Sequence, residues 1–257
     1  MLLKDQVCVV VGAASLRSIG YATAELFVRH GARVVAVDIA MDDHALGEIK
    51  ASIENAGLRP SDLAGARCDI SNPADCEQLC RDVVERHGTF DCLVNCAALV
   101  RSQPLLEISE VDYDRIVDVN LKGTFNLCRS ALKVFADRKC GAIVNLASVA
   151  AQRGGGLVGG AHYAASKGGV ISLTKAIARE FGPLGIRANV ICPSMTETGM
   201  LDGNVSAEAF REIVAGIPLR RAARPIDIAG ACLFLASDLS AYVTGATIDV
   251  NGGSHIH

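Results

Sequence analysis

The sequence predicts an α/β domain built on a doubly wound, parallel, seven-stranded sheet with helices on both faces. Short apolar runs alternate with helix-length amphipathic segments along all 257 residues. The runs are continuously apolar, which is typical of parallel strands buried on both faces. Right-handed crossovers between such strands produce the doubly wound arrangement. The chain shows no linker, low-complexity tract or internal repeat, so we expect residues 1–257 to form a single domain.

Glycines, prolines and acidic residues mark the boundaries of the expected elements. The helix over Ile19–His30 stops at Gly31, and Pro73 stands in the first turn of a later helix, where no N–H donor is needed. The expected strands are Val7–Val11, Arg33–Asp38, Leu63–Cys68, Asp91–Asn95, Ala142–Ala147, Arg187–Cys192 and Thr247–Val250. The expected helices are Ile19–His30, Asp43–Ala56, Ser71–His87, Ser109–Ala136, His162–Gly182 and Pro225–Ala236.

The composition argues against several classes of partner. A formal net charge of −3 gives no reason to expect nucleic acid or an anionic membrane, and the absence of Trp argues against a base-stacking surface. No apolar run approaches the roughly 18 residues of a membrane span, and the N-terminus lacks a signal-peptide pattern. None of the ten cysteines forms a Cys-x-x-Cys pair. We therefore expect no metal, reduced buried thiols and a cytoplasmic location.

The first strand–helix junction predicts a dinucleotide site of the Rossmann type. Its small residues, Gly12 and Ser15 among them, allow the backbone to approach a pyrophosphate at the N-terminus of the next helix. An ordinary glycine-rich turn is the alternative, but an acid at the end of the second strand favours nucleotide binding. That acid, Asp38, would accept both adenosine ribose hydroxyls and repel a 2′-phosphate, which favours NAD over NADP. Its alternative role is a helix N-cap.

Tyr163 and Lys167 are spaced by four residues, so on a helix they share one face. An ammonium group near a phenol stabilises the phenolate and lowers the pKa of the phenol from about 10 towards working pH. The pair is therefore a candidate general base. The alternative is a surface Tyr beside a solvated Lys. A Ser 15 residues before Tyr163, Ser148, and the upstream glycine loop favour a catalytic site.

With these motifs in place, the chain resembles the short-chain dehydrogenase/reductase family from Val7 to Gly253. No single motif is specific for this family, but the combination of motifs is. The segments that carry the resemblance are the loop after Val11, Asp38, Asp69, Asn95-Cys-Ala-Ala98, Asn120, Ser148, Tyr163 with Lys167, Cys192-Pro-Ser194, Thr198, and the tail Tyr242–Gly253.

The resemblance implies a role for each matching residue. Tyr163 would be the acid/base, Lys167 would hold the nicotinamide ribose, and Ser148 would hydrogen-bond the substrate oxygen. Asn120 would hold a water molecule that links Lys167 to solvent. The implied cofactor-binding residues are Gly12, Ser15, Arg17, Ser18, Ile19, Asp38, Asp69, Ile70, Asn95, Ala97, Tyr163, Lys167, Pro193, Met195 and Thr198.

The glycine loop departs from the family pattern. It is two residues longer than usual, and Ser18 takes the place of the middle glycine. The loop is partly similar to that of enoyl-acyl-carrier reductases, but those enzymes space Tyr and Lys more widely than this chain does. Arg17 could reach a 2′-phosphate, whereas Asp38 argues against one. The balance favours NAD as cofactor.

The substrate is expected to be small, polar and acidic. Arg153 lies in the long loop between Ser148 and Tyr163, and Arg101 follows the Asn95 motif. Either guanidinium could bind a carboxylate, although a solvated surface arginine is the alternative for each. Residues 195–216 are the expected lid, with Met195, Met200 and Leu201 facing the substrate, and the C-terminal His257 is a possible contributor from a neighbouring subunit.

The sequence is compatible with three candidate functions. The first is an NAD-dependent dehydrogenase that oxidises a secondary alcohol of a sugar or sugar acid, such as a 2-keto-3-deoxy-sugar acid. The second is a 3-oxoacyl-carrier-protein reductase using NADPH, and the third is a catalytically silent NAD-binding regulator. The intact set of Asn120, Ser148, Tyr163 and Lys167 argues against the third. The resemblance also implies a homotetramer with the two long helices and the last strand at its interfaces.

Overall fold

The sheet has the predicted architecture. The computed structural model describes residues 1–155, 158–202 and 205–256. Its seven strands are all parallel in the order β3-β2-β1-β4-β5-β6-β7, which confirms the doubly wound α/β fold. The strands are β1 (Val7–Val11), β2 (Arg33–Asp38), β3 (Leu63–Arg67), β4 (Cys92–Asn95), β5 (Gly141–Leu146), β6 (Ile186–Pro193) and β7 (Thr247–Val250).

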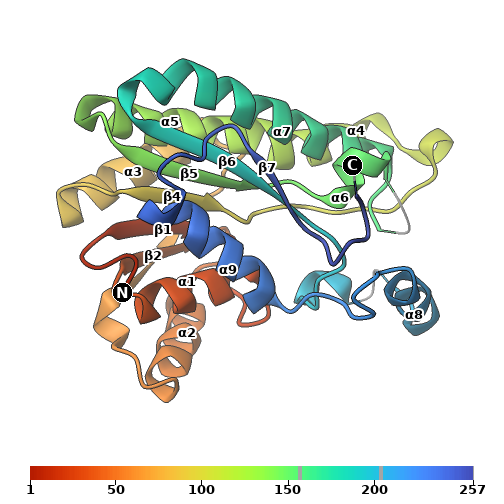
Figure 1. Cartoon of the computed structure of the whole chain (residues 1–257), viewed down its shortest axis with the longest axis horizontal. Helices are drawn as coiled ribbons and strands as arrows, with labels where there is room; N and C mark the ends of the chain where they lie inside the picture. The colour runs from red at the N-terminus through yellow and green to blue at the C-terminus, as the bar shows by residue number, and fades with distance from the viewer. Residues whose placement is uncertain (156–157, 203–204, 257) are drawn as a thin grey trace.

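Helices cover both faces of this sheet (Figure 1). One layer holds α1 (Ile19–Arg29), α2 (Asp43–Asn55) and α9 (Pro225–Ala236), and the other holds α3 (Pro73–His87), α5 (Gly123–Arg138) and α7 (Ala161–Phe181). Each layer has its own apolar core. Because side chains of one strand alternate between faces, Cys8 and Val10 enter the first core while Val7, Val9 and Val11 enter the second.

The long helix expected over Ser109–Ala136 is interrupted, and that expectation is corrected. The structure has α4 (Glu110–Val117), a π-helical segment η3 (Asp118–Lys122) and then α5. One extra residue per turn turns the helix surface and redirects the carbonyl groups, and such π segments occur often at functional sites. Asn120 lies in this segment and is fully buried. Two further helices outside the predicted set, α6 (Val149–Arg153) and α8 (Ala207–Ala215), lie in the expected substrate loop and lid.

Parallel strands place their carboxyl ends at one edge of the sheet, and the predicted site residues collect there. Asp38 ends β2, Asn95 ends β4 and Pro193 ends β6. The order of the strands reverses between β1 and β4, and that switch point is where nucleotides bind in such sheets. No helix of the described residues is long and apolar enough to cross a membrane. Within the same residues no group of three or more His, Cys, Asp or Glu side chains is arranged to bind a metal ion.

The cysteines largely follow the expectation. All ten are free, and eight of them are buried. Cys96 is half-buried and Cys140 is exposed, so the prediction of uniformly buried thiols is wrong at these two positions. Burial raises the pKa of the Cys128 thiol to about 12, which keeps it protonated and unreactive.

Candidate active site

A cavity of about 400 Å³ opens at the carboxyl edge of the sheet. Ser148, Tyr163 and Lys167 line it, so the three residues that the sequence singled out are brought together. Its walls come from the ends of β5 and β6, from α6, from the start of α7 and from the segment after β6. Of the predicted cofactor residues, Ile19, Pro193, Met195 and Thr198 also line this cavity.

The glycine loop after β1 is built for close approach. Gly12 has φ +85°, and a Cβ atom there would lie 2.8 Å from the backbone N of Ala97. A Cβ atom on Gly20 would lie 2.2 Å from the carbonyl oxygen of Gly12. Ser18 caps α1, because its Oγ accepts a hydrogen bond from Tyr21 N at 2.9 Å. Ser18 therefore supplies a helix cap at this position, and a helix N-terminus placed here suits a pyrophosphate.

Asp38 is held in place at the end of β2. Its Oδ2 accepts from Ala14 N and its Oδ1 from Ala40 N, each at 3.1 Å. Each carboxylate oxygen has a further lone pair, so the group can still accept hydrogen bonds from two ribose hydroxyls. Asp38 is not the N-cap of α2, since Asp42 takes that role. The arrangement fits the predicted nucleotide site.

Arg17 is directed towards the lid. Its guanidinium contacts Asp202 through two hydrogen bonds, of 2.6 and 3.1 Å. Both side chains are about 62% exposed. Ser15 Oγ accepts a hydrogen bond from Arg17 N at 3.3 Å, which shapes the loop locally. In this structure Arg17 is therefore engaged by a carboxylate.

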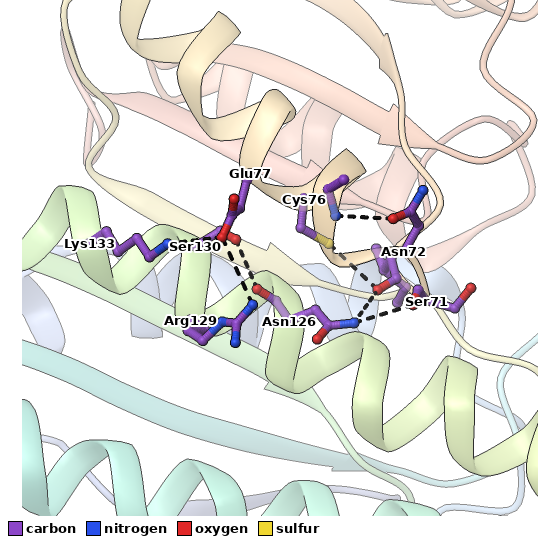
Figure 2. A network of polar contacts seen from close by, with 10 residues as sticks. Ser71, Asn72, Cys76, Glu77, Asn126, Arg129, Ser130 and Lys133 are labelled. Carbon is purple, nitrogen blue, oxygen red and sulfur yellow. Dashed lines mark hydrogen bonds and ion pairs between the residues drawn. The ribbon is translucent and has the colours of Figure 1, made fainter.

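The expected adenine end of the site is fixed by α5. Asp69 Oδ1 accepts from both N and Oγ of Ser71, at 2.9 and 2.7 Å. Asn126 Nδ2 donates to the carbonyl oxygens of Ile70 and Ser71, at 3.2 and 3.4 Å. Figure 2 shows Asn126 of α5 reaching across to this segment before α3. A Cβ atom on Gly123 would lie 2.7 Å from the Ile70 side chain, so α5 packs tightly against Ile70.

An ion-pair group ties the same two helices together on their outer side. Glu77 of α3 lies 2.9 Å from Lys133 and 3.9 Å from Arg129, both of α5 (Figure 2). The lysine ammonium holds the pKa of the Glu77 carboxyl below its usual range. These side chains are largely solvated, so the pairs contribute little to stability. They join α3 to α5 on the side of the expected adenine segment.

The catalytic residues come from two helices. Ser148 is the N-cap of α6, and its Oγ accepts from Ala150 N at 3.1 Å. Tyr163 and Lys167 lie one turn apart on α7, and only 8% and 2% of their surfaces are exposed. Ser148 also hydrogen-bonds the phenol of Tyr163. Lys167 Nζ donates to the carbonyl oxygen of Leu146 at 2.7 Å.

Burial governs the ionisation of this pair. It lowers the pKa of Lys167 to about 8, because the ammonium group loses most of its hydration. It also raises the pKa of the Tyr163 phenol above its usual value, and the hydrogen bond with Ser148 offsets only part of this rise. The expectation that Lys167 lowers the pKa of Tyr163 is therefore not met, because desolvation of the phenol is the largest influence on its pKa.

Asn120 anchors the segment after β4. Its Oδ1 accepts from Leu99 N at 2.8 Å and its Nδ2 donates to Leu99 O at 2.9 Å. The same Nδ2 also reaches Ser166 Oγ on α7 at 3.1 Å. Asn120 thus joins the catalytic helix to the cavity wall. Its expected role in holding a water molecule stays a prediction.

Some of the predicted substrate residues line the cavity and others do not. Arg153 and Met200 line the cavity, as does Leu201. Arg101 is not among the lining residues, because its guanidinium pairs with Asp112 at the start of α4. Glu212 of α8 and Ser254 of the tail also line the cavity, and neither was among the predicted site residues. His257 lies outside the described residues.

The turn before α7 presses against the catalytic tyrosine. Gly159 has φ +88°, and a Cβ atom there would lie 2.4 Å from Cδ1 of Tyr163. Gly159 N donates to Ser102 Oγ, and Gly160 N donates to Arg101 O, both at 2.9 Å. Hydrogen bonds to Ser102 and Arg101 therefore hold the turn on one side, and its other side contacts the ring of Tyr163. It sets the position of the phenol.

We predict that Gly159→Ala lowers kcat by about 10- to 100-fold, because displacing a reacting group by about 1 Å has effects of that size. Gly88→Ala is the matched control, since Gly88 has φ +79° and open space around its missing Cβ atom. Both variants place an alanine at a position with positive φ. Kinetics and thermal unfolding of the two are compared, and an equal loss of kcat in both would contradict the role of the turn.

Comparison with known proteins agrees with the geometry. The family model described as Enoyl-(Acyl carrier protein) reductase matches residues 12–255. A short-chain type dehydrogenase/reductase of uncharacterised function, y4mP of Sinorhizobium fredii, is 46% identical and covers 100% of both chains. The chain belongs to the short-chain dehydrogenase/reductase family. It is accordingly an oxidoreductase that binds a nicotinamide cofactor, NAD or NADP, and acts on CH–OH groups.

Other members of the family are similar along nearly the whole chain. The 3-oxoacyl-[acyl-carrier-protein] reductase FabG of Thermotoga maritima is 36% identical, covering 98% of this chain and 99% of its own. A solved structure, gox2181, superposes with a TM-score of 0.91 at 30% identity, over 98% of this chain and 96% of its own. This similarity agrees with the predicted fold. It leaves the substrate open.

Proposed function

We propose that the chain is an NAD-dependent dehydrogenase that oxidises a secondary alcohol of a small acidic substrate, such as a 2-keto-3-deoxy-sugar acid, to a ketone. The observation that carries this proposal is that Arg153 and Glu212 line the same cavity as Tyr163. A guanidinium suits a carboxylate, and a carboxylate suits hydroxyl groups. A substrate that bears both groups satisfies both side chains.

The protein residues handle the proton and the orientation. Ser148 donates a hydrogen bond to the substrate oxygen, and the Tyr163 phenolate takes the proton of the substrate hydroxyl. Lys167 would hold the nicotinamide ribose, as the family resemblance implies. NAD⁺, when bound, supplies the hydride acceptor and a positive charge beside the phenol. Asp38 supports NAD, because its fixed carboxylate repels a 2′-phosphate.

A second candidate is the reduction of a 3-oxoacyl thioester with NADPH. Apolar side chains make up much of the cavity wall, including Val158, Met195 and Ile217. They suit an acyl chain. The relatives FabG of Thermotoga maritima and the acetoacetyl-CoA reductase of Allochromatium vinosum carry names of this kind. Glu212 favours the first candidate, since an acyl chain offers no hydroxyl group for this carboxylate to bind.

Initial rates with NAD⁺ and NADP⁺ across a panel of sugar acids and 3-hydroxy acids separate the candidates. The first predicts NADH formation with acidic polyols and slow turnover with NADP⁺. Predominant NADPH-driven reduction of acetoacetyl thioesters would overturn it and support the second. Dead-end binding of NADH, with no turnover of any alcohol or ketone, would leave the regulator hypothesis.

Arg153→Ala is expected to raise KM for acidic substrates by about 10- to 100-fold, the value of a lost charge-assisted hydrogen bond. KM for neutral alcohols changes far less. Arg101→Ala is the comparison, because that guanidinium pairs with Asp112 beside the cavity. Equal increases in KM for acidic and neutral substrates would contradict the carboxylate role.

We also propose a homotetramer in the cytoplasm. Apolar side chains are exposed on the faces that the sequence assigned to interfaces, with Val111 of α4 at 76% and Phe125 of α5 at 43%. Tyr242, just before β7, is fully exposed in the single chain. Such patches are typical of surfaces covered by another subunit. Light scattering at micromolar concentration tests the assembly.

A further inference from the structure

Thr124, the second residue of α5, joins two residues of the predicted cofactor site. Asn95 Nδ2 donates to Thr124 Oγ1 at 2.9 Å. Thr124 Oγ1 donates in turn to the carbonyl oxygen of Asn120 at 2.6 Å. All three residues are at most 2% exposed, so water does not compete for these contacts.

These bonds belong to a closed ring of contacts around residues 95–99. Asn95 Oδ1 accepts from Ala97 N at 3.2 Å, which fixes the start of the segment. Asn120 makes two hydrogen bonds to the backbone of Leu99, which fix its end. Thr124 links the two asparagines and so closes the ring.

The ring matters because this segment is part of the cavity. Cys96 and Ala98 line its wall, and Ala97 lies against the glycine loop at Gly12. The bond from Thr124 also holds the carbonyl oxygen of Asn120, and with it the Asn120 backbone, within the π-helical segment.

We propose that Thr124 is a positioning residue, which holds Asn95 on the ribose side and Asn120 on the proton-relay side in one frame. The inference rests on the proposed function, because the roles of both asparagines come from the family resemblance. One hydroxyl, acting as acceptor and as donor, thereby couples nucleotide binding to proton transfer. Without it, Asn95 Nδ2 becomes a buried donor with no acceptor.

The chain contains a matched control. Thr174 of α7 is fully buried, accepts from Asn145 Nδ2 at 3.0 Å and donates to the carbonyl oxygen of Val170 at 2.8 Å. Asn145 is the register partner of Asn95 on the neighbouring strand. Thr174 therefore repeats the bonding pattern of Thr124, but its helix partner is Val170 instead of Asn120.

The test compares Thr124→Val with Thr174→Val. We expect similar losses of thermal stability, but only Thr124→Val weakens NADH binding, measured by the fluorescence of NADH, and lowers kcat, each by about tenfold or more. Only Thr124→Val shifts the acid limb of the pH profile of kcat/KM. Thr124→Ser, which keeps the hydroxyl, has an NADH affinity and a kcat near those of the wild type.

Other results overturn the inference. If the two valine variants lose NADH affinity and activity equally, Thr124 has a structural role alone. If Thr124→Val binds NADH and turns over as the wild type does, the ring has no functional role. Failure of the proposed function looks different, because the wild type then turns over no alcohol or ketone, while the NADH measurement still compares the two threonines.

Discussion

Tyr163→Phe is expected to reduce kcat by about a thousandfold, within the range that removal of a general acid–base group produces. Phenylalanine fills the same buried space on α7 but has no proton to exchange with the substrate hydroxyl. Cofactor binding should change little, because Asp38 and the glycine loop carry most of it. Steady-state kinetics and an NADH titration measure the two effects separately.

The matched control is Tyr113→Phe, since Tyr113 is 47% exposed on α4 and lies outside the cavity lining. It should behave as the wild type does. Activity that survives in Tyr163→Phe would show that the proton moves by another route. A loss of NADH binding equal to the loss of kcat would instead indicate a collapsed site.

Lys167→Met is expected to abolish turnover and to stabilise the fold at the same time. Lys167 is 2% exposed, and burial lowers the pKa of its ammonium group from 10.5 to about 8. Charging it inside the protein therefore costs the folded state about 3 kcal/mol at pH 7, at about 1.4 kcal/mol for each pKa unit. Methionine removes that cost, so the free energy of unfolding should rise by about 1–3 kcal/mol.

The sign of the pH dependence follows from the same shift. Between the folded pKa of about 8 and the unfolded value of 10.5, the unfolded chain keeps the proton that the folded chain has lost. Stability of the wild type relative to Lys167→Met should therefore rise with pH across this window. Lys175→Met, on the exposed side of α7, is the control and should show no such difference. If the free energy of unfolding has the same pH dependence in the wild type and in Lys167→Met, the lowered pKa of Lys167 is contradicted.

The fold was predictable because its signals are local and repeated. Continuous apolar strands such as Val7–Val11 require helices on both faces, and right-handed crossovers then leave few topologies. The π-helical segment Asp118–Lys122 was not predictable, because an insertion of a single residue barely alters the apolar periodicity of a long helix. Helix α8 was missed because the lid was treated as a loop, although Ala207–Ala215 is strongly amphipathic.

Local features of the site were likewise predictable, and features that depend on packing were not. Tyr163 and Lys167 are four residues apart on one helix, so their spacing in the sequence predicts that they lie close together. The partner of Arg101 depends on where α4 begins, and only the folded chain shows that Asp112 takes its guanidinium. The raised pKa of Tyr163 likewise depends on burial. Ser254 gave no signal in the sequence, because it reaches the cavity only through the packing of the tail.

The most direct test of the account follows the hydride itself. The protein is incubated with NADH that carries two deuterium atoms at C4 of the nicotinamide and with the ketone of an alcohol that it oxidises, and the alcohol product is examined by mass spectrometry. We expect the wild type to form alcohol with one deuterium on the carbinol carbon, and Tyr163→Phe to form almost no alcohol in the same time. A wild-type alcohol without deuterium, or an equal yield of labelled alcohol from Tyr163→Phe, would contradict hydride transfer at this site.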